Sequence, residues 1–286
     1  MQSARDIKSR IRSVGNTRQI AKAMEVVSAT KMRRGQEVAM GARNFARALY
    51  DMFAQMPAEI INAHPLIQPR GGRRELVVVI ASDKGLAGVF NSAVIRTAES
   101  HIRKSSQEHP VDVITLGKKA REYFKRSQAN VIHEYTATGD YTNESQTRII
   151  SEHILNRYIQ KSCDSITLIS THFISTLRQE VRIQKILPLE QISATDSEKL
   201  SYERIFEPSV EAVLDLALPY LFHLKFYEAI INSNAAEHSA RMLAMKKAGD
   251  NAKEIVSELT LEYNKSRQAA ITQEISEIVA GSQSVQ

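Results

Sequence analysis

The sequence predicts an α/β protein in which the two ends of the chain form a long antiparallel coiled coil and an α/β domain is inserted between them. Apolar residues recur at helical spacing over residues 1–57 and again over residues 208–286. Between them, over residues 75–188, segments typical of strands alternate with segments typical of helices. The first pattern indicates paired helices, and the second indicates a largely parallel sheet covered by helices.

The N-terminal segment predicts one long helix, because no proline occurs before Pro57 and apolar residues follow a three-four ladder. In the middle of the segment we expect the ladder to slip by one position, so that Ile20, Met24 and Val27 take over. Gly35 and Gly41 weaken the helix slightly but allow close approach of a second backbone. The other members of the ladder are Ile7, Ile11, Val14, Ala21, Met32, Ala39, Ala42, Ala46, Leu49, Phe53 and Met56.

The middle segment predicts a Rossmann-like domain. Strands are expected at ELVVVIAS, VDVITLG and NVIHEY, and a hairpin at SITLISTHF and QEVRIQKILPL. Helices are expected at GVFNSAVIRTAESHIRK, KKAREYFKRS and ESQTRIISEHILNRYIQK. Strands that alternate with helices of this length favour parallel pairing.

The C-terminal segment predicts a second, longer helix, which starts near Pro208 and Ser209. Pro219 should kink the helix or restart it. From Val210 a heptad ladder keeps its phase for about sixty residues, which is typical of a left-handed coiled coil. Its members are Val210, Leu214, Ala217, Leu221, Leu224, Glu228, Ile231, Ala235, His238, Met242, Met245, Gly249, Ala252, Val256, Leu259, Tyr263, Ser266 and Ala270.

Helix length decides how these segments combine. At 1.5 Å per residue, about 52 residues span roughly 80 Å and about 72 span roughly 110 Å, whereas a compact domain is only about 30 Å across. The two helices must therefore pair with each other and project from the domain. Because the second helix is longer by about 20 residues, its end should extend past its partner.

Composition limits the possible functions. The single cysteine, Cys163, excludes a disulfide framework and a multi-cysteine metal site, and we expect it to be a small buried residue. The net charge of +6 lies wholly within residues 1–60, which indicates a basic surface that seeks an acidic partner. We expect no signal peptide and no membrane-spanning segment, since no run of eighteen apolar residues occurs.

Motifs for chemistry are missing from the sequence. It contains no P-loop, H-E-x-x-H, C-x-x-C or G-x-S-x-G pattern. The segment ASDKGLAGVFN could cradle a phosphate, but a tight strand-to-helix turn explains it better. The basic stretch TKMRRGQ could bind nucleic acid, yet it has no aromatic residue, so a basic face turned to solvent or protein is the better interpretation. We expect a mechanical or scaffolding protein without enzymatic activity or cofactor.

Both ends of the chain resemble one known family. DIKSRIRSVGNTRQIAKAMEVVSATKMRR (residues 6–34) and ARMLAMKKAGDNAKEIVSELTLEYNKSRQAAITQEISEIVAG (residues 240–281) are similar to the terminal helices of the gamma subunit of F-type ATP synthase. SDKGLAG resembles the turn after that family's first strand, with Ala87 where cysteine is common. The resemblance covers the whole chain and is of the bacterial type, without the insert of plant and cyanobacterial forms.

The resemblance implies a rotor shaft that performs no chemistry. In that family the coiled coil turns inside a ring of alpha and beta subunits, and the α/β domain binds the epsilon subunit and the membrane c-ring. Ion flow, expected to be of protons, then drives ATP synthesis in the ring. The implied location is peripheral, on the cytoplasmic face of the bacterial inner membrane. A coiled-coil scaffold or tether whose basic helix binds an acidic partner, or a nucleic-acid-binding protein, stays as an alternative.

Residue roles also follow from the resemblance. Arg267 and Gln268 match a pair that hydrogen-bonds with loops of the ring, and Thr272 and Glu274 match neighbouring polar contacts. Met24 matches a position that faces the lower, acidic loops of the beta subunits. From their charge, we infer that Arg33 and Arg34 are cationic partners of those loops.

Overall fold

The computed structural model describes residues 4–53, 56, 58–136, 144–190 and 206–283. The chain divides into two compact units, one of residues 29–240 and the other of residues 1–28 and 241–286. The two long helices, α1 (Ala4–Phe53) and α6 (Val210–Gln283), each contribute to both units.

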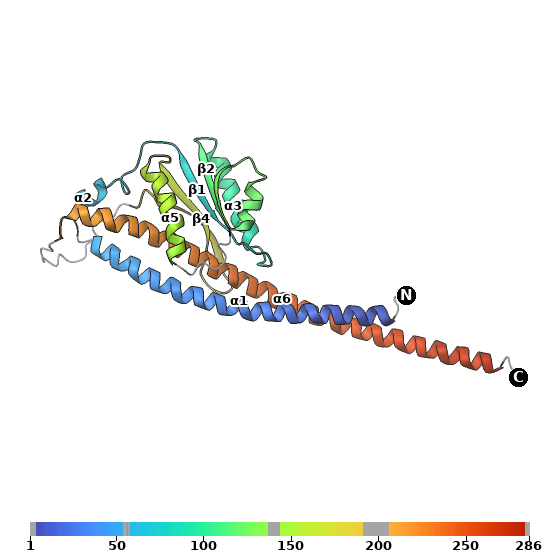
Figure 1. The fold of residues 1–286 in the computed structure, drawn as a ribbon. Coiled ribbons are helices and arrows are strands. Elements are labelled where there is room, and N and C mark those ends of the chain that lie inside the picture. The colour runs from blue at the N-terminus through green and yellow to red at the C-terminus, as the bar shows by residue number, and fades with distance from the viewer. Residues whose placement is uncertain (1–3, 54–55, 57, 137–143, 191–205, 284–286) are drawn as a thin grey trace. The chain divides into compact units, whose positions relative to one another are not determined.

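The larger unit is built on a five-stranded sheet, drawn in Figure 1. Its strands are β1 (Glu75–Ile80), β2 (Val111–Leu116), β3 (Asn130–Tyr135), β4 (Ser165–Phe173) and β5 (Gln179–Leu187). They lie in the order β3-β2-β1-β4-β5. The pairings β1–β2, β1–β4 and β2–β3 are parallel, whereas β4 and β5 form an antiparallel hairpin. The predicted strands, the largely parallel sheet and the hairpin are therefore confirmed.

Alternation along β1 assigns its side chains to two faces of the sheet. Val77 and Val79 join one cluster with residues of α3 (Phe90–Ser105) and α4 (Lys118–Phe124). Leu76 and Val78 join another with residues of α5 (Glu144–Ile159) and α6. Helices therefore cover both faces, which explains why β1 reads as an unbroken apolar run.

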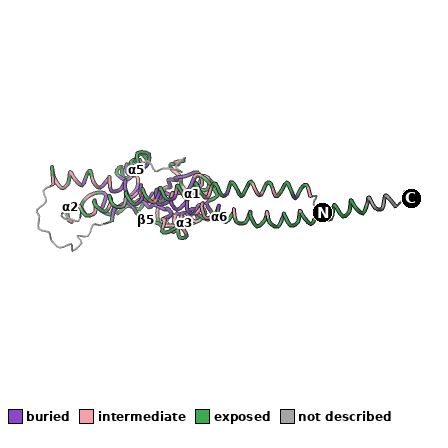
Figure 2. The backbone as a smooth tube through the Cα atoms, turned by 90° about the horizontal axis from the view of Figure 1, so that it is seen from below, coloured by how far each residue is buried: buried purple, intermediate pink, exposed green. Residues whose placement is uncertain are grey.

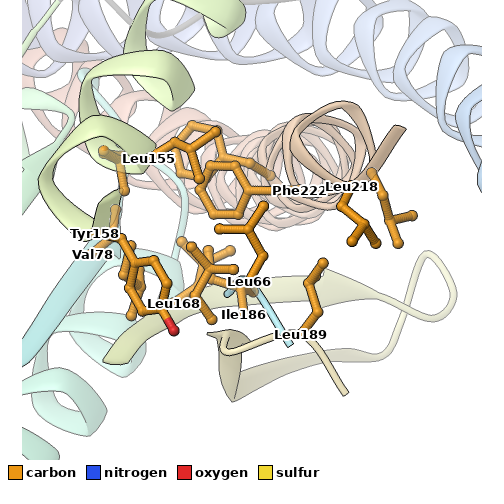
Figure 3. Close-up of a cluster of buried hydrophobic side chains, with 14 of the residues drawn as sticks. Leu66, Val78, Leu155, Tyr158, Leu168, Ile186, Leu189, Leu218 and Phe222 are labelled. Atoms are coloured by element: carbon orange, nitrogen blue, oxygen red, sulfur yellow. The ribbon is translucent and has the colours of Figure 1, made fainter. Parts of the chain in front are cut away.

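The second cluster is the main core of this unit, and Figure 3 shows part of it. Leu218 and Phe222 come from α6, and Leu155 and Tyr158 come from α5. The short helix α2 (Ala58–Ala63) adds Ile61, and the end of α1 adds Phe53. Within this unit α6 thus packs against the sheet, α5 and α1, which leaves most of its side chains between residues 218 and 240 buried.

The predicted seam of α6 is confirmed along almost its whole length, since each of its positions from Val210 to Ser266 is buried or half-buried. Ala270, the last predicted member, is exposed. Pro219 lies inside the helix, so α6 does not restart there.

The predicted slip in the ladder of α1 is wrong. Ile20 and Val27 are 61% and 55% exposed, whereas Ala21 and Ser28 are buried. The buried positions instead keep one phase, since Ala21, Ser28 and Gly35 recur at a spacing of seven residues. Such small residues allow a facing helix to approach closely. In the larger unit this approach is visible directly: a Cβ added to Gly35 would lie 3.4 Å from the Cβ of Ala235.

The smaller unit contains the first part of α1 and the last part of α6, which run antiparallel (Figure 1). Ile7, Ala21, Met245, Ala252 and Leu259 are its buried apolar residues. The end of α6 continues past the start of α1, as the length argument predicts (Figure 1). Figure 2 shows that the described part of this end, before the grey trace begins, is exposed.

Candidate partner-binding surface

The exposed end of α6, residues 267–276, carries four of the predicted contact residues. Arg267, Gln268, Thr272 and Glu274 are all exposed, as is every other residue of this stretch. The last half-buried residue before it is Ser266, so the seam stops one residue earlier. The prediction that this segment outruns its partner helix is therefore confirmed, while its contacts stay a prediction.

Helix geometry arranges these four side chains in two pairs. At about 100° per residue, Arg267 and Glu274 lie within about 20° of each other around the helix, and Gln268 and Thr272 lie about 40° apart. The two pairs point about 100–160° apart. The Thr272 hydroxyl donates to the backbone oxygen of Gln268 at 2.9 Å, which orients the hydroxyl and leaves both of its lone pairs able to accept a hydrogen bond.

Sequence reasoning missed two apolar side chains between these pairs. Ile271 and Ile275 are 47% and 56% exposed, and their directions fall between those of Arg267 and Gln268. Together the six residues form a face about 160° wide with an apolar middle and polar margins, which is the usual composition of a binding surface. The spacing of four residues between the isoleucines, outside the phase of the seam, is the signal that could have revealed it.

Met24 lies in a second apolar strip, on α1, between two exposed residues. Met24 is half-buried, and Ile20 and Val27 flank it at spacings of four and three residues. This is the strip that sequence analysis assigned to the seam. The structure does not bring Met24 to the end of α6, because Met24 lies about 30 Å along α1 from Ala4.

Arg33 and Arg34 are exposed on α1, in the larger unit. Both guanidinium groups therefore lie on the surface of the structure and are accessible to an external carboxylate. Their exposure agrees with the expected basic face turned to solvent or protein, while their contact with an acidic partner stays a prediction.

The glycine-containing turn after β1 is a strand-to-helix turn closed by its own side chains. Asn91 Oδ1 accepts hydrogen bonds from the backbone nitrogen and the hydroxyl of Ser82, at 3.0 Å and 2.9 Å. Asp83 Oδ1 accepts a bond from the backbone nitrogen of Lys118 at 2.8 Å. Gly88 supplies a backbone with φ of 55°, which the turn needs. These internal bonds support the structural interpretation of the turn over a phosphate cradle.

Cys163 is buried, as predicted. Burial raises the pKa of its thiol to about 11, so the reactive thiolate is scarce at neutral pH. Within the part of the chain that the structure describes, His, Cys, Asp and Glu side chains form no cluster able to hold a metal ion. The described helices also include none that is long and apolar enough to cross a membrane.

The fold and the exposed helix end together define a class of protein: two long terminal helices that enclose an α/β insertion and leave a bare helix end. Solved structures share this fold. A chain of the Euglena gracilis mitochondrial ATP synthase, in a structure described as OSCP/F1/c-ring, has a TM-score of 0.67 at 17% identity, over 99% of this chain and 94% of that one. A chain from the central stalk and c-ring of Tetrahymena thermophila mitochondrial ATP synthase has a TM-score of 0.62 at 23% identity, over 80% and 99%.

Sequence comparison is more specific. A family model described as ATP synthase matches residues 3–285. The ATP synthase gamma chain of Herpetosiphon aurantiacus is 41% identical, with 98% of both chains covered. That of Desulfitobacterium hafniense is 37% identical over the full length of both. The chain therefore belongs to the ATP synthase gamma chain family, the non-catalytic central-stalk rotor of F-type ATP synthase.

Proposed function

We propose that residues 267–276 of α6 are the part of the rotor that contacts the alpha and beta subunits of the catalytic ring. The observation that carries the proposal is that every residue of this stretch is exposed, on a face with an apolar middle and polar margins. A solvated helix end does not need Ile271 and Ile275 on its surface, whereas a helix that has partners around it does. Arg267 and Gln268 then supply directional hydrogen bonds to the ring, with Thr272 and Glu274 beside them.

The coupling of rotation to catalysis follows from thermodynamic linkage between the helix end and the conformations of the subunits around it. A single helix end with different side chains on its different faces stabilises a different conformation in each subunit around it. Rotation moves that bias from one catalytic site to the next. Proton flow through the membrane part of the complex thereby drives ATP synthesis, and the rotor itself makes or breaks no bond.

Further contacts are proposed along α1. We infer that Met24, within the strip of Ile20 and Val27, faces the lower loops of the beta subunits. Arg33 and Arg34 meet acidic side chains of those loops. Exposed apolar and cationic residues in the same helix suit a protein surface of mixed character, and they do not suit nucleic acid, for which aromatic stacking or a denser basic patch is typical.

The remaining partners follow the same logic. We propose that residues 1–57 and 208–286 serve as the coiled-coil shaft and that residues 75–188 form the domain that meets the epsilon subunit and the c-ring. The similar solved structures contain a c-ring together with a central stalk or with F1, which supports this assembly. We also propose a peripheral position on the cytoplasmic face of the bacterial inner membrane, since the similar gamma chains come from bacteria.

The first test is the double substitution Arg267→Ala with Gln268→Ala in the assembled complex. Each lost hydrogen bond is worth about 1 kcal/mol, and 1.4 kcal/mol corresponds to about tenfold in rate, so loss of two bonds should lower ATP turnover coupled to proton pumping roughly thirtyfold. The measurement is ATP hydrolysis and ATP-driven proton uptake in membrane vesicles.

A matched control is Arg73→Ala with Gln68→Ala, which removes the same two residue types from exposed positions outside both the shaft and the domain proposed to meet other subunits. This variant should keep normal turnover. Unchanged activity in the Arg267 and Gln268 variant, with the complex intact, would rule out a functional contact between these residues and the ring. Failure of the chain to co-purify with alpha and beta subunits would contradict the assembly itself.

A further inference from the structure

A buried histidine joins α5 to α6. The ring of His223, on α6, lies with its Nδ1 2.6 Å from the hydroxyl oxygen of Ser151, on α5. Both residues are buried, at 5% and 1% exposure. Tyr220 and Tyr227 lie beside the ring on α6, and Phe45 of α1 packs edge-on against Tyr220. All of these residues belong to the larger unit.

The protons at this contact can be assigned from its geometry. The Ser151 hydroxyl donates its only proton to the backbone oxygen of Arg148, at 2.9 Å. The neutral ring of His223 must then donate its Nδ1 proton to Ser151, which leaves Nε2 with a bare lone pair. In agreement with this, Nε2 has no hydrogen-bond partner among the described residues. A carboxylate oxygen of Glu144 lies 3.8 Å from Nε2, which is too far for a hydrogen bond.

A second proton on this ring would place a charge at the buried helix contact. Burial disfavours that charge and lowers the pKa of His223, and the nearby cation of Arg148 lowers it further. Glu144 and Glu152 act in the opposite direction. These three charged groups all lie on α5, and the Glu144 side chain is 52% exposed, so solvent weakens its compensation.

We propose that His223 makes the attachment of α5 to α6 sensitive to acid, because uptake of a proton by the buried ring loosens the two helices from each other. The unfolded or opened chain has an ordinary imidazole, with a pKa near 6.5, and takes up the proton first. The contribution of His223 to stability is therefore present above about pH 6.5. It is lost as the pH falls from there through the lower pKa of the folded state.

Hydrogen exchange of α5 tests this inference on the full chain in its purified complex. Exchange is measured at pH 7.5 and 5.5 and corrected for the intrinsic pH dependence of the amides. The wild type should show a several-fold rise in the opening of the α5 residues that face α6, around Ser151, at the lower pH. His223→Asn places an amide where Nδ1 lies and carries no charge, so it should abolish the rise. Glu144→Gln removes a compensating charge and should enlarge it.

His153→Asn is the matched control. His153 also lies on α5 and its pKa is also lowered, chiefly by burial, but its ring contacts Tyr135 and His133 of β3. This variant should keep the acid response at the face toward α6. An equal rise in wild type and His223→Asn, or none in the wild type, would overturn the proposal.

A direct titration of the His223 ring tests the proposal even if His223→Asn does not fold. The wild-type chain, with its histidine rings labelled for NMR, should then show a His223 signal that titrates below pH 6.5. Titration of that signal at or above 6.5 would contradict the inference.

Discussion

Glu75, the first residue of β1, shows how a buried carboxylate is held at the edge of the core. It is 6% exposed. Thr167 donates its hydroxyl proton to Oε1, His101 Nε2 lies 3.1 Å from Oε1, and His109 Nε2 lies 3.3 Å from Oε2. Burial acts to raise the pKa of Glu75, but the hydrogen bonds from Thr167 and His101 and the charge of His101 together lower it. The carboxylate therefore ties β1 to β4, to α3 and to the segment before β2.

This arrangement predicts a stability that depends on pH. Because the folded pKa is lowered, the contribution of Glu75 is fully present above the unfolded value of 4.5 and is lost as the pH falls below it. Glu75→Gln should lower the free energy of unfolding at pH 7 by about 2 kcal/mol, the size of a hydrogen bond to a charged group. It should also make stability less dependent on pH below 4.5. Denaturant unfolding at pH 7 and pH 4 measures both effects.

Glu180→Gln is the control, because Glu180 is exposed on the edge strand β5. Its unfolding at pH 7 should match the wild type. If Glu75→Gln were as stable as Glu180→Gln at pH 7, the carboxylate would have no role in holding these elements together.

At the scale of the helix, two glycines of α1 differ in their surroundings, since one is closely packed and the other faces open space. A Cβ at Gly35 would touch Ala235 at 3.4 Å, whereas a Cβ at Gly41 would meet nothing within 4 Å. Gly35→Leu should therefore force the helices apart and cost about 1–3 kcal/mol. Gly41→Leu should stabilise the helix by up to about 1 kcal/mol through helix propensity. Thermal unfolding of the two variants gives the comparison, and equal shifts would contradict the seam drawn through Gly35.

The elements themselves could be predicted from sequence because their periodicity is strong. Each expected strand and helix of residues 75–188 has its counterpart in the structure. The phase of the buried seam of α1 could not be predicted, since apolarity alone favours Ile20 and Val27 as buried residues over Ala21 and Ser28. Burial in a tight helix pair depends on the size of a side chain as well as its polarity, and a small serine meets that requirement. The same error hid an exposed apolar strip around Met24.

The candidate surface was predicted in part. Helix length alone was enough to expect exposure of Arg267, Gln268, Thr272 and Glu274, while their roles come from the family resemblance. Ile271 and Ile275 were missed, because the sequence prediction followed the phase of the heptad ladder and these two residues lie outside that phase. Only the structure shows that both side chains are exposed.

At the scale of the whole chain, the exposed end of α6 should contribute little to folding. A chain that ends at Ser266 should unfold at nearly the wild-type temperature, since residues 267–276 bury no side chain. A chain that ends at Asn251 also loses Ala252 and Leu259, which are buried, and should unfold at a lower temperature. Calorimetry of both truncated chains tests this. A large loss of stability in the longer one would show that the end of α6 does have a partner within the chain.

The bare end of α6 also has a consequence for how the helix forms. An isolated helix of about ten residues is unstable in water because its first turn must be nucleated at a large cost in entropy. Residues 267–276 avoid that step, since they extend a helix whose earlier turns are fixed by the seam. They stay helical because each residue adds to a helix that is already formed, which costs less entropy than forming a first turn. Melting of this segment should therefore begin at its C-terminal side, advance residue by residue, and stop at Ser266, where side-chain packing begins.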